Sequence, residues 1–127
     1  MRMLLAVAAG GALGSVMRYM VAVALGHWLG FGFPWGTLAV NVAGSFAMGL
    51  LVELGALVWQ PAPELRALLV VGVLGGFTTF SAFGGDTLAL AQGGAWRLVA
   101  LNVAANVGLG LAAVWAGRAV AVAALGR

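Results

Sequence analysis

The sequence predicts an all-α membrane protein with four transmembrane helices, of which the third is broken near the bilayer midplane. Apolar residues make up 64% of the 127 residues, only 7% are charged, and the mean hydropathy is +1.12. A soluble domain of this size could not hide so much apolar surface, so the lipid bilayer must act as its solvent. Proline, glycine and polar residues divide the chain into four apolar stretches.

Each apolar stretch is long enough to cross the membrane as a helix. The hydrocarbon core is about 30 Å thick, and a helix rises about 1.5 Å per residue. The loops between the stretches contain prolines, glycines or aromatic residues, which end helices or lie at the membrane interface. We therefore expect one domain without linkers or tandem repeats, with spans at residues 3–25, 35–58, 65–91 and 96–124.

The first stretch has two alternative interpretations. Arg2 precedes apolar residues, and residues 6–8 fit the cleavage site of a signal peptide. However, the apolar stretch continues to about Leu25, which is too long for a signal peptide, and three further spans follow. We therefore interpret it as a membrane span in which Gly10 and Gly14 pack closely against another helix.

The third stretch contains the most informative segment, residues 75–83, which read Gly-Gly-Phe-Thr-Thr-Phe-Ser-Ala-Phe. Adjacent glycines weaken a helix, and three hydroxyl side chains lie where lipid offers no hydrogen-bond partner. From Leu65 to Gly76 a helix would rise roughly 17 Å, which places the segment near the midplane. Unwound backbone there frees carbonyls for a cation, or N–H groups and hydroxyls for an anion. We therefore expect a pore or an ion site.

Asparagines in the second and fourth stretches predict a polar track across the membrane. Asn41 and Ser45 are four residues apart, as are Asn102 and Asn106, so each pair shares one face of its helix. A single buried amide is explained by packing between helices, which polar residues stabilise in membranes. Three asparagines on two helices, together with the hydroxyl-rich segment on a third, favour the track.

Two phenylalanines, Phe80 and Phe83, are predicted to share a helical face beyond the unwound segment. The positive edges of aromatic rings, with hydroxyls and N–H groups, can bind a small anion without trapping it by full charge. Acidic residues in mid-span are more typical of a cation pathway, and the sequence has none there. Glu53, near the end of its span, and Asp86 are expected to face water.

The charged residues give weak information about topology and exclude some functions. Six arginines and no lysine, against three acidic residues, give a net charge of +3, scattered singly with no basic patch for nucleic acid. Arg18 lies deep in the first span, where it either snorkels to the interface or draws anions to a pore mouth. Four spans put both termini on one side, with a modest arginine excess that favours the cytoplasm. The arginines on that side are Arg2, Arg66, Arg118 and Arg127, against Arg97 on the other.

Several kinds of chemistry have no support in the sequence. Cysteine is absent, which excludes disulfides, thiolate metal sites and a cysteine nucleophile. The single histidine, His27, has no second metal ligand nearby, and the serines in the spans have no histidine base for a hydrolase triad.

Three segments together resemble one family. Residues 10–19, 36–46 and 75–83 are similar to the first, second and third helix patterns of the CrcB, or Fluc, family of fluoride channels, and the resemblance covers essentially the whole chain. The third segment is the most diagnostic. The chain departs from the family at Ala82, where a hydroxyl residue is common, and at Gly108 and Gly110, where related chains often carry serines.

The resemblance implies a dual-topology homodimer of two antiparallel chains with two fluoride pores, in a bacterial plasma or inner membrane. It also implies a structural sodium ion at the dimer centre, held by backbone carbonyls at positions matching Gly75 and Thr78. The weak arginine bias fits antiparallel insertion, and a segment at the midplane would meet its copy across the two-fold axis. The implied pore residues are Asn41, Phe80, Phe83, Ser81, Thr79 and Asn106.

We therefore expect a passive, fluoride-selective channel that exports fluoride from the cytoplasm and is not an enzyme. One alternative is a small multidrug exporter coupled to protons, which needs a titratable carboxylate within a span, typically the first. The first span here contains Arg18 and no acid. The other alternative is a non-transporting assembly subunit whose polar residues only hold helices together.

Overall fold

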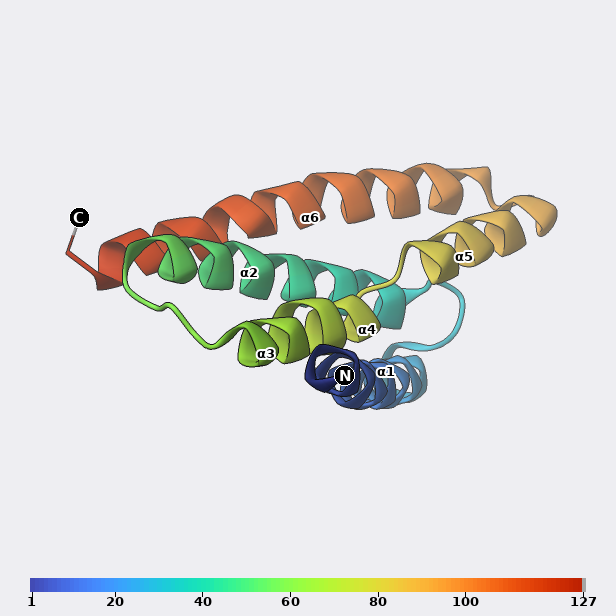
Figure 1. The fold of residues 1–127 in the computed structure, drawn as a ribbon. Helices are drawn as coiled ribbons and strands as arrows, with labels where there is room; N and C mark the ends of the chain where they lie inside the picture. The colour runs from blue at the N-terminus through green and yellow to red at the C-terminus, as the bar shows by residue number, and fades with distance from the viewer. Residues whose placement is uncertain (127) are drawn as a thin grey trace.

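The computed structural model describes residues 1–126, which form four helical passes (Figure 1). All four are long and apolar enough to cross a membrane, which confirms the four predicted spans. Arg127, counted above among the flanking arginines, lies outside the described residues. The passes are α1 (Arg2–Leu29), α2 (Trp35–Leu57), a composite third pass of α3 (Pro63–Arg66), the π-helix η1 (Ala67–Leu74), α4 (Gly75–Phe77) and α5 (Phe80–Gln92), and finally α6 (Trp96–Ala124).

The first helix extends beyond its predicted end near Leu25. It continues to Leu29 and ends at Gly30, whose φ of 85° lies in the left-handed region that favours glycine. The N–H of Gly30 donates to the carbonyl of Gly26 over 2.8 Å. Gly26, expected in the loop, is instead a buried helical residue because the ring of Phe31 folds back against it.

The third pass leaves helical geometry within the predicted segment, after its two glycines. Gly75 and Gly76 are helical, and the extended residues are Thr78 (φ −82°, ψ 156°) and Thr79 (φ −154°, ψ 121°). We call these two threonines the α4–α5 link. Gly76 instead allows close packing, because a Cβ there would lie 2.6 Å from the carbonyl oxygen of Gly11 on α1.

Helix α1 packs on the third pass through small residues. Gly10 and Gly14 are buried, and a Cβ on either would overlap a backbone carbonyl of η1, that of Leu68 or Val73 respectively. Gly72 on η1 faces Gly10 in return, with its Cβ position 2.8 Å from the Cα of Gly10. The predicted packing role of Gly10 and Gly14 is therefore confirmed.

Helices α2 and α6 lie side by side and run in the same direction (Figure 1). A hydrogen bond joins Asn41 to Asn106, 65 residues further along the chain. The same offset of 65 residues recurs at each following turn of the two helices. A Cβ on Gly49 would overlap the carbonyl of Val114, and an ion pair joins Glu53 to Arg118. We call this register the α2–α6 ladder; its pairs are Asn41–Asn106, Ser45–Gly110, Gly49–Val114 and Glu53–Arg118.

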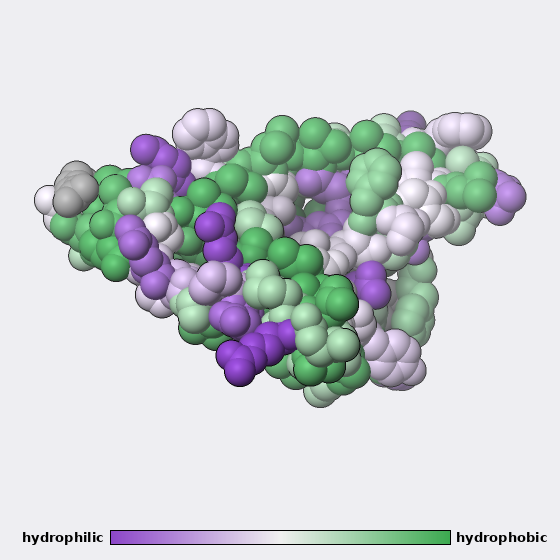
Figure 2. Space-filling model, in the orientation of Figure 1, coloured by the Kyte–Doolittle hydropathy of each residue, from purple (hydrophilic) through white to green (hydrophobic). Residues whose placement is uncertain are grey.

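The surface of the chain is mostly apolar, as expected for a protein dissolved in lipid. Large hydrophobic side chains are exposed along every pass, and the buried residues are mainly small. Figure 2 shows hydrophobic residues over most of this face, with hydrophilic residues gathered mostly toward the end where α2 leads into α3. A second hydrophilic patch lies inside a hollow beside α5 and α6.

Candidate functional site

The side chain of Asn41, on α2, binds the backbone of the α4–α5 link. The N–H of Thr79 donates to Asn41 Oδ1 over 2.8 Å, and Asn41 Nδ2 donates to the carbonyl of Thr79 over 3.0 Å. Thr79 is buried, at 8% exposure, so its N–H needs an acceptor that the interrupted helix does not supply. The side-chain amide of Asn41 therefore satisfies this N–H, adds a donor to the carbonyl and keeps the link extended.

The link also leaves the last carbonyls of α4 without helical donors, and those of Gly75 and Thr78 are among them. In a continuous helix, the N–H groups of Thr79 and Ala82 would donate to the carbonyls of Gly75 and Thr78. Here they donate to Asn41 Oδ1 and to Thr79 Oγ1, the latter over 3.1 Å. Gly75 and Thr78 thus present carbonyl oxygens without their usual helical partners, which is the donor type that unwound membrane helices offer to a hard cation.

These neutral oxygens are the candidate cation ligands in this part of the protein. Within residues 1–126, no three His, Cys, Asp or Glu side chains lie close enough together to hold a metal ion. The hydroxyl of Thr78 is directed elsewhere, because it donates to the carbonyl of Leu74 over 2.9 Å. A cation at the link would therefore depend on the main chain.

A continuous chain of hydrogen bonds, which we call the polar track, runs from Asn41 across α6 to α5. Asn41 Nδ2 donates to Asn106 Oδ1 over 3.0 Å, and Asn106 Nδ2 donates to Asn102 Oδ1 over 2.9 Å. Asn102, which is fully buried, donates to Thr87 Oγ1 over 3.1 Å, and Thr87 donates to the carbonyl of Phe83 over 2.7 Å. Every buried polar side-chain atom in the described residues has a partner.

Two members of the polar track were absent from the predicted pore residues. Asn102 could have been included, because its spacing from Asn106 places both on one face of α6. Thr87 has no such signal in the sequence, since no polar residue lies three or four positions away from it on α5. Only the packing of α5 against α6 brings its hydroxyl to Asn102.

An open groove of about 340 Å³ lies along the polar track and gathers most of the predicted pore residues. The rings of Phe80 and Phe83 lie 5.5 Å apart between centroids, and Phe80 is 84% exposed in the single chain. Ser81 lies outside the groove and contacts it through its hydroxyl, 3.3 Å from that of Thr79. The predicted residues that line the groove are Asn41, Thr79, Phe80, Phe83 and Asn106, with Thr78 beside them.

The structure keeps Arg18 apart from this groove. Arg18 lies on α1, whereas the groove is lined by α2, the α4–α5 link, α5 and α6. Its side chain is half-buried and makes no ion pair with any other residue in 1–126. A role in attracting anions therefore finds no contact in the single chain.

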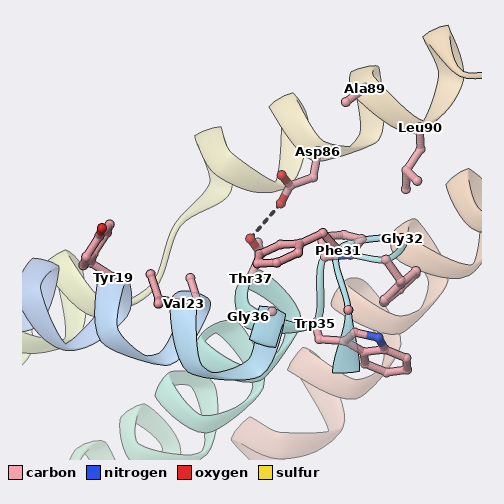
Figure 3. Close-up of a pocket in the computed structure, with 15 residues that line it drawn as sticks. Tyr19, Val23, Phe31, Gly32, Trp35, Gly36, Thr37, Asp86, Ala89 and Leu90 are labelled. Atoms are coloured by element: carbon pink, nitrogen blue, oxygen red, sulfur yellow. Dashed lines mark hydrogen bonds between the residues drawn. The ribbon is translucent and has the colours of Figure 1, made fainter. Parts of the chain in front are cut away.

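A second cavity, of about 480 Å³, lies where α1, α2 and α5 meet (Figure 3). Aromatic side chains line it, among them Tyr19, Phe31 and Trp35. Thr37 donates to Asp86 Oδ2 over 2.7 Å, which ties α5 to the first turn of α2. The carboxylate also lies near the positive N-terminal end of α2.

Glu53 and Asp86 have partners on other helices, and their expected exposure to water stays a prediction. Asp86 is half-buried and accepts the hydrogen bond from Thr37. The side chain of Glu53 is 18% exposed, and its Oε2 lies 3.2 Å from Nε of Arg118. The sequence could not reveal these partners, because both lie on other helices.

Comparisons with known proteins identify close relatives. The family described as CrcB-like protein, Camphor Resistance (CrcB), matches residues 5–118. A protein from Rhodospirillum centenum named fluoride-specific ion channel FluC is 60% identical over 119 residues, covering 94% of each chain. Proteins of the same name from Agrobacterium fabrum and Nitrobacter winogradskyi are 53% and 48% identical, covering 89% and 90% of this chain and 90% of each relative.

Proposed function

Because the chain belongs to the CrcB family, we propose that it is a channel through which fluoride leaves the cytoplasm passively. Its relatives are named fluoride-specific ion channels, and it is a multi-pass membrane protein with four spanning helices. Hydrogen fluoride crosses membranes as a neutral acid and ionises inside the cell. A channel lets the trapped anion leave, aided by a negative-inside potential, and this requires no covalent chemistry, so the protein is not an enzyme.

The observation that carries this proposal is the groove in which the polar track meets Phe80 and Phe83. The lining consists of side-chain amides, hydroxyls and aromatic rings, and it contains no arginine or carboxylate. The amide N–H groups of Asn41 and Asn106 donate within the polar track, so an anion would bind by replacing those acceptors. Such neutral donors favour a small anion but bind it weakly enough to release it. Conduction needs that combination.

We further propose that two chains insert antiparallel and that each completes the other's pore. The groove is open along one side, and Phe80 projects from it into the surroundings. A second chain would cover this side and shield the polar track from lipid. This proposal requires the third pass to be interrupted near the midplane, so that the α4–α5 links of both chains meet at the two-fold axis.

A structural sodium ion at that axis is part of the same proposal. Gly75 and Thr78 would supply two carbonyl oxygens from each chain, and these oxygens lack their usual helical donors. Bound sodium would supply positive charge between the two links. This chain's own contribution is to hold the carbonyls in place, through the two hydrogen bonds between Asn41 and Thr79.

Fluoride efflux from liposomes that contain the purified protein tests the function directly. We expect fluoride to leave faster than chloride by on the order of tenfold or more, because the lining binds a small anion that accepts strong hydrogen bonds. Electrodes for the two ions follow both rates in the same preparation. Equal rates, or no flux of either ion, would show that the chain is not a fluoride-selective channel.

Phe80→Ile tests whether the aromatic ring takes part in conduction. Isoleucine keeps an apolar side chain but removes the positive ring edge, so fluoride efflux should fall by roughly tenfold. Phe31→Ile is the matched control, because Phe31 is also largely exposed (77%) and lies outside the groove. If both variants conduct like the original protein and keep its size in detergent, Phe80 does not line the pathway.

A further inference from the structure

The α2–α6 ladder continues beyond the groove to a pair of opposite charges. Its rungs run from Asn41–Asn106 to Glu53–Arg118, a distance of roughly 18 Å along α2. The groove follows the ladder as far as Met48 and Val114. Arg118 lies one helical turn beyond Val114 on the same face of α6, so the ion pair stands next to the end of the groove.

The guanidinium of Arg118 is available to a further ligand. Its Nε lies 3.2 Å from Glu53 Oε2, and its Cζ lies 6.0 Å from the centre of the Trp115 ring. The side chain is 52% exposed, whereas that of Glu53 is only 18% exposed. Because a guanidinium has five N–H donors, the pair with Glu53 leaves several directed away from the carboxylate.

We propose that Arg118, partly neutralised by Glu53, is an anion-binding site at the end of the groove, which takes up a small inorganic anion such as fluoride. This inference rests on the proposed function. An arginine alone would bind the anion strongly and slow its release, and conduction requires weaker binding. The carboxylate of Glu53 lowers the local positive potential and thereby sets the affinity of the site.

A purely structural ion pair would behave differently. A pair in which one side chain is half-exposed contributes little to stability, and the close glycine contacts of the ladder already join α2 to α6. Removing either partner of such a pair would have similar effects. Removing either partner of an anion site changes the local charge in opposite directions, so the two cases can be distinguished.

The test compares Glu53→Gln, Arg118→Gln and the double variant in fluoride efflux over a range of fluoride concentrations. Arg118→Gln leaves an unneutralised carboxylate and should lower efflux by on the order of tenfold. Glu53→Gln leaves an unneutralised guanidinium, so efflux should saturate at a fluoride concentration lower by about fivefold. The double variant should lie between the two single variants.

Glu64→Gln and Arg66→Gln are the matched controls. Both residues lie in α3, at the same end of the molecule, and neither forms an ion pair within residues 1–126. They change the net charge by the same amounts as the test variants, so unchanged efflux in both would exclude a general effect of charge at this end. Changes equal to those of the test variants would overturn the proposal.

Fluoride titration of the detergent-purified proteins, followed by calorimetry, separates this inference from the channel itself. Tighter binding by Glu53→Gln and weaker binding by Arg118→Gln support the site, even if the original protein shows no efflux and the channel proposal fails. If the protein conducts fluoride but both variants lose efflux and thermal stability to the same extent, the pair is structural and the inference is wrong.

Discussion

Asn41→Leu is expected to lower the rate of fluoride efflux by on the order of a hundredfold. It should also lower the stability of the fold. Leucine fills a similar volume but removes the two hydrogen bonds to Thr79 and the one to Asn106. The buried N–H of Thr79 then has no acceptor, and each unsatisfied group of this kind costs about 1–3 kcal/mol. Efflux and thermal unfolding in detergent, measured on the same preparation, check both effects.

Two further variants locate the cause of that loss. Asn41→Asp keeps an acceptor for the N–H of Thr79 but places carboxylate oxygens against the carbonyl of Thr79 and Oδ1 of Asn106. It should therefore also lose efflux. Ser45→Ala changes the next rung of the α2–α6 ladder, where the hydroxyl makes no hydrogen bond within residues 1–126, and efflux should fall much less. Normal efflux and stability in Asn41→Leu would mean that Asn41 neither holds the link nor lines the pathway.

Gly49→Ala is expected to separate α2 from α6 and to lower stability by about 3 kcal/mol, as overpacking of a close contact does. The added Cβ would overlap the backbone carbonyl of Val114, which no side-chain rotation can relieve. Gly117→Ala should act in the same way from α6, because its Cβ would overlap the carbonyl of Phe46. Efflux should fall with stability, since a shift between the helices breaks the hydrogen bond from Asn41 to Asn106.

Gly55→Ala is the matched control for this prediction. Gly55 lies on the same helix, and a Cβ there would meet no atom within 4 Å. Alanine is also the better helix former, so this variant should be as stable as the original protein or slightly more stable. Thermal unfolding of the three variants in one detergent tests the close contact of α2 with α6. Equal midpoint temperatures of unfolding for Gly49→Ala and Gly55→Ala would contradict that contact.

The number of spans and the helix faces of the polar residues could be predicted from the sequence. Hydropathy and helix length are local properties, and they predicted the four spanning helices. The four-residue spacing of Asn41 and Ser45, and of Asn102 and Asn106, follows from helix geometry alone. A resemblance over three segments indicated the family, to which the chain belongs.

How these faces meet could not be predicted from the sequence and follows from the packing of the helices. The sequence placed the unwound part of the third pass within residues 75–83, but only the fold shows that the extended residues are Thr78 and Thr79, where the amide of Asn41 binds the backbone of Thr79. The parallel register of α2 and α6, which joins Glu53 to Arg118, likewise has no local signature. The physical reason is that periodicity specifies one helix at a time, whereas close glycine contacts and hydrogen bonds from side chain to backbone select which turns of two helices meet.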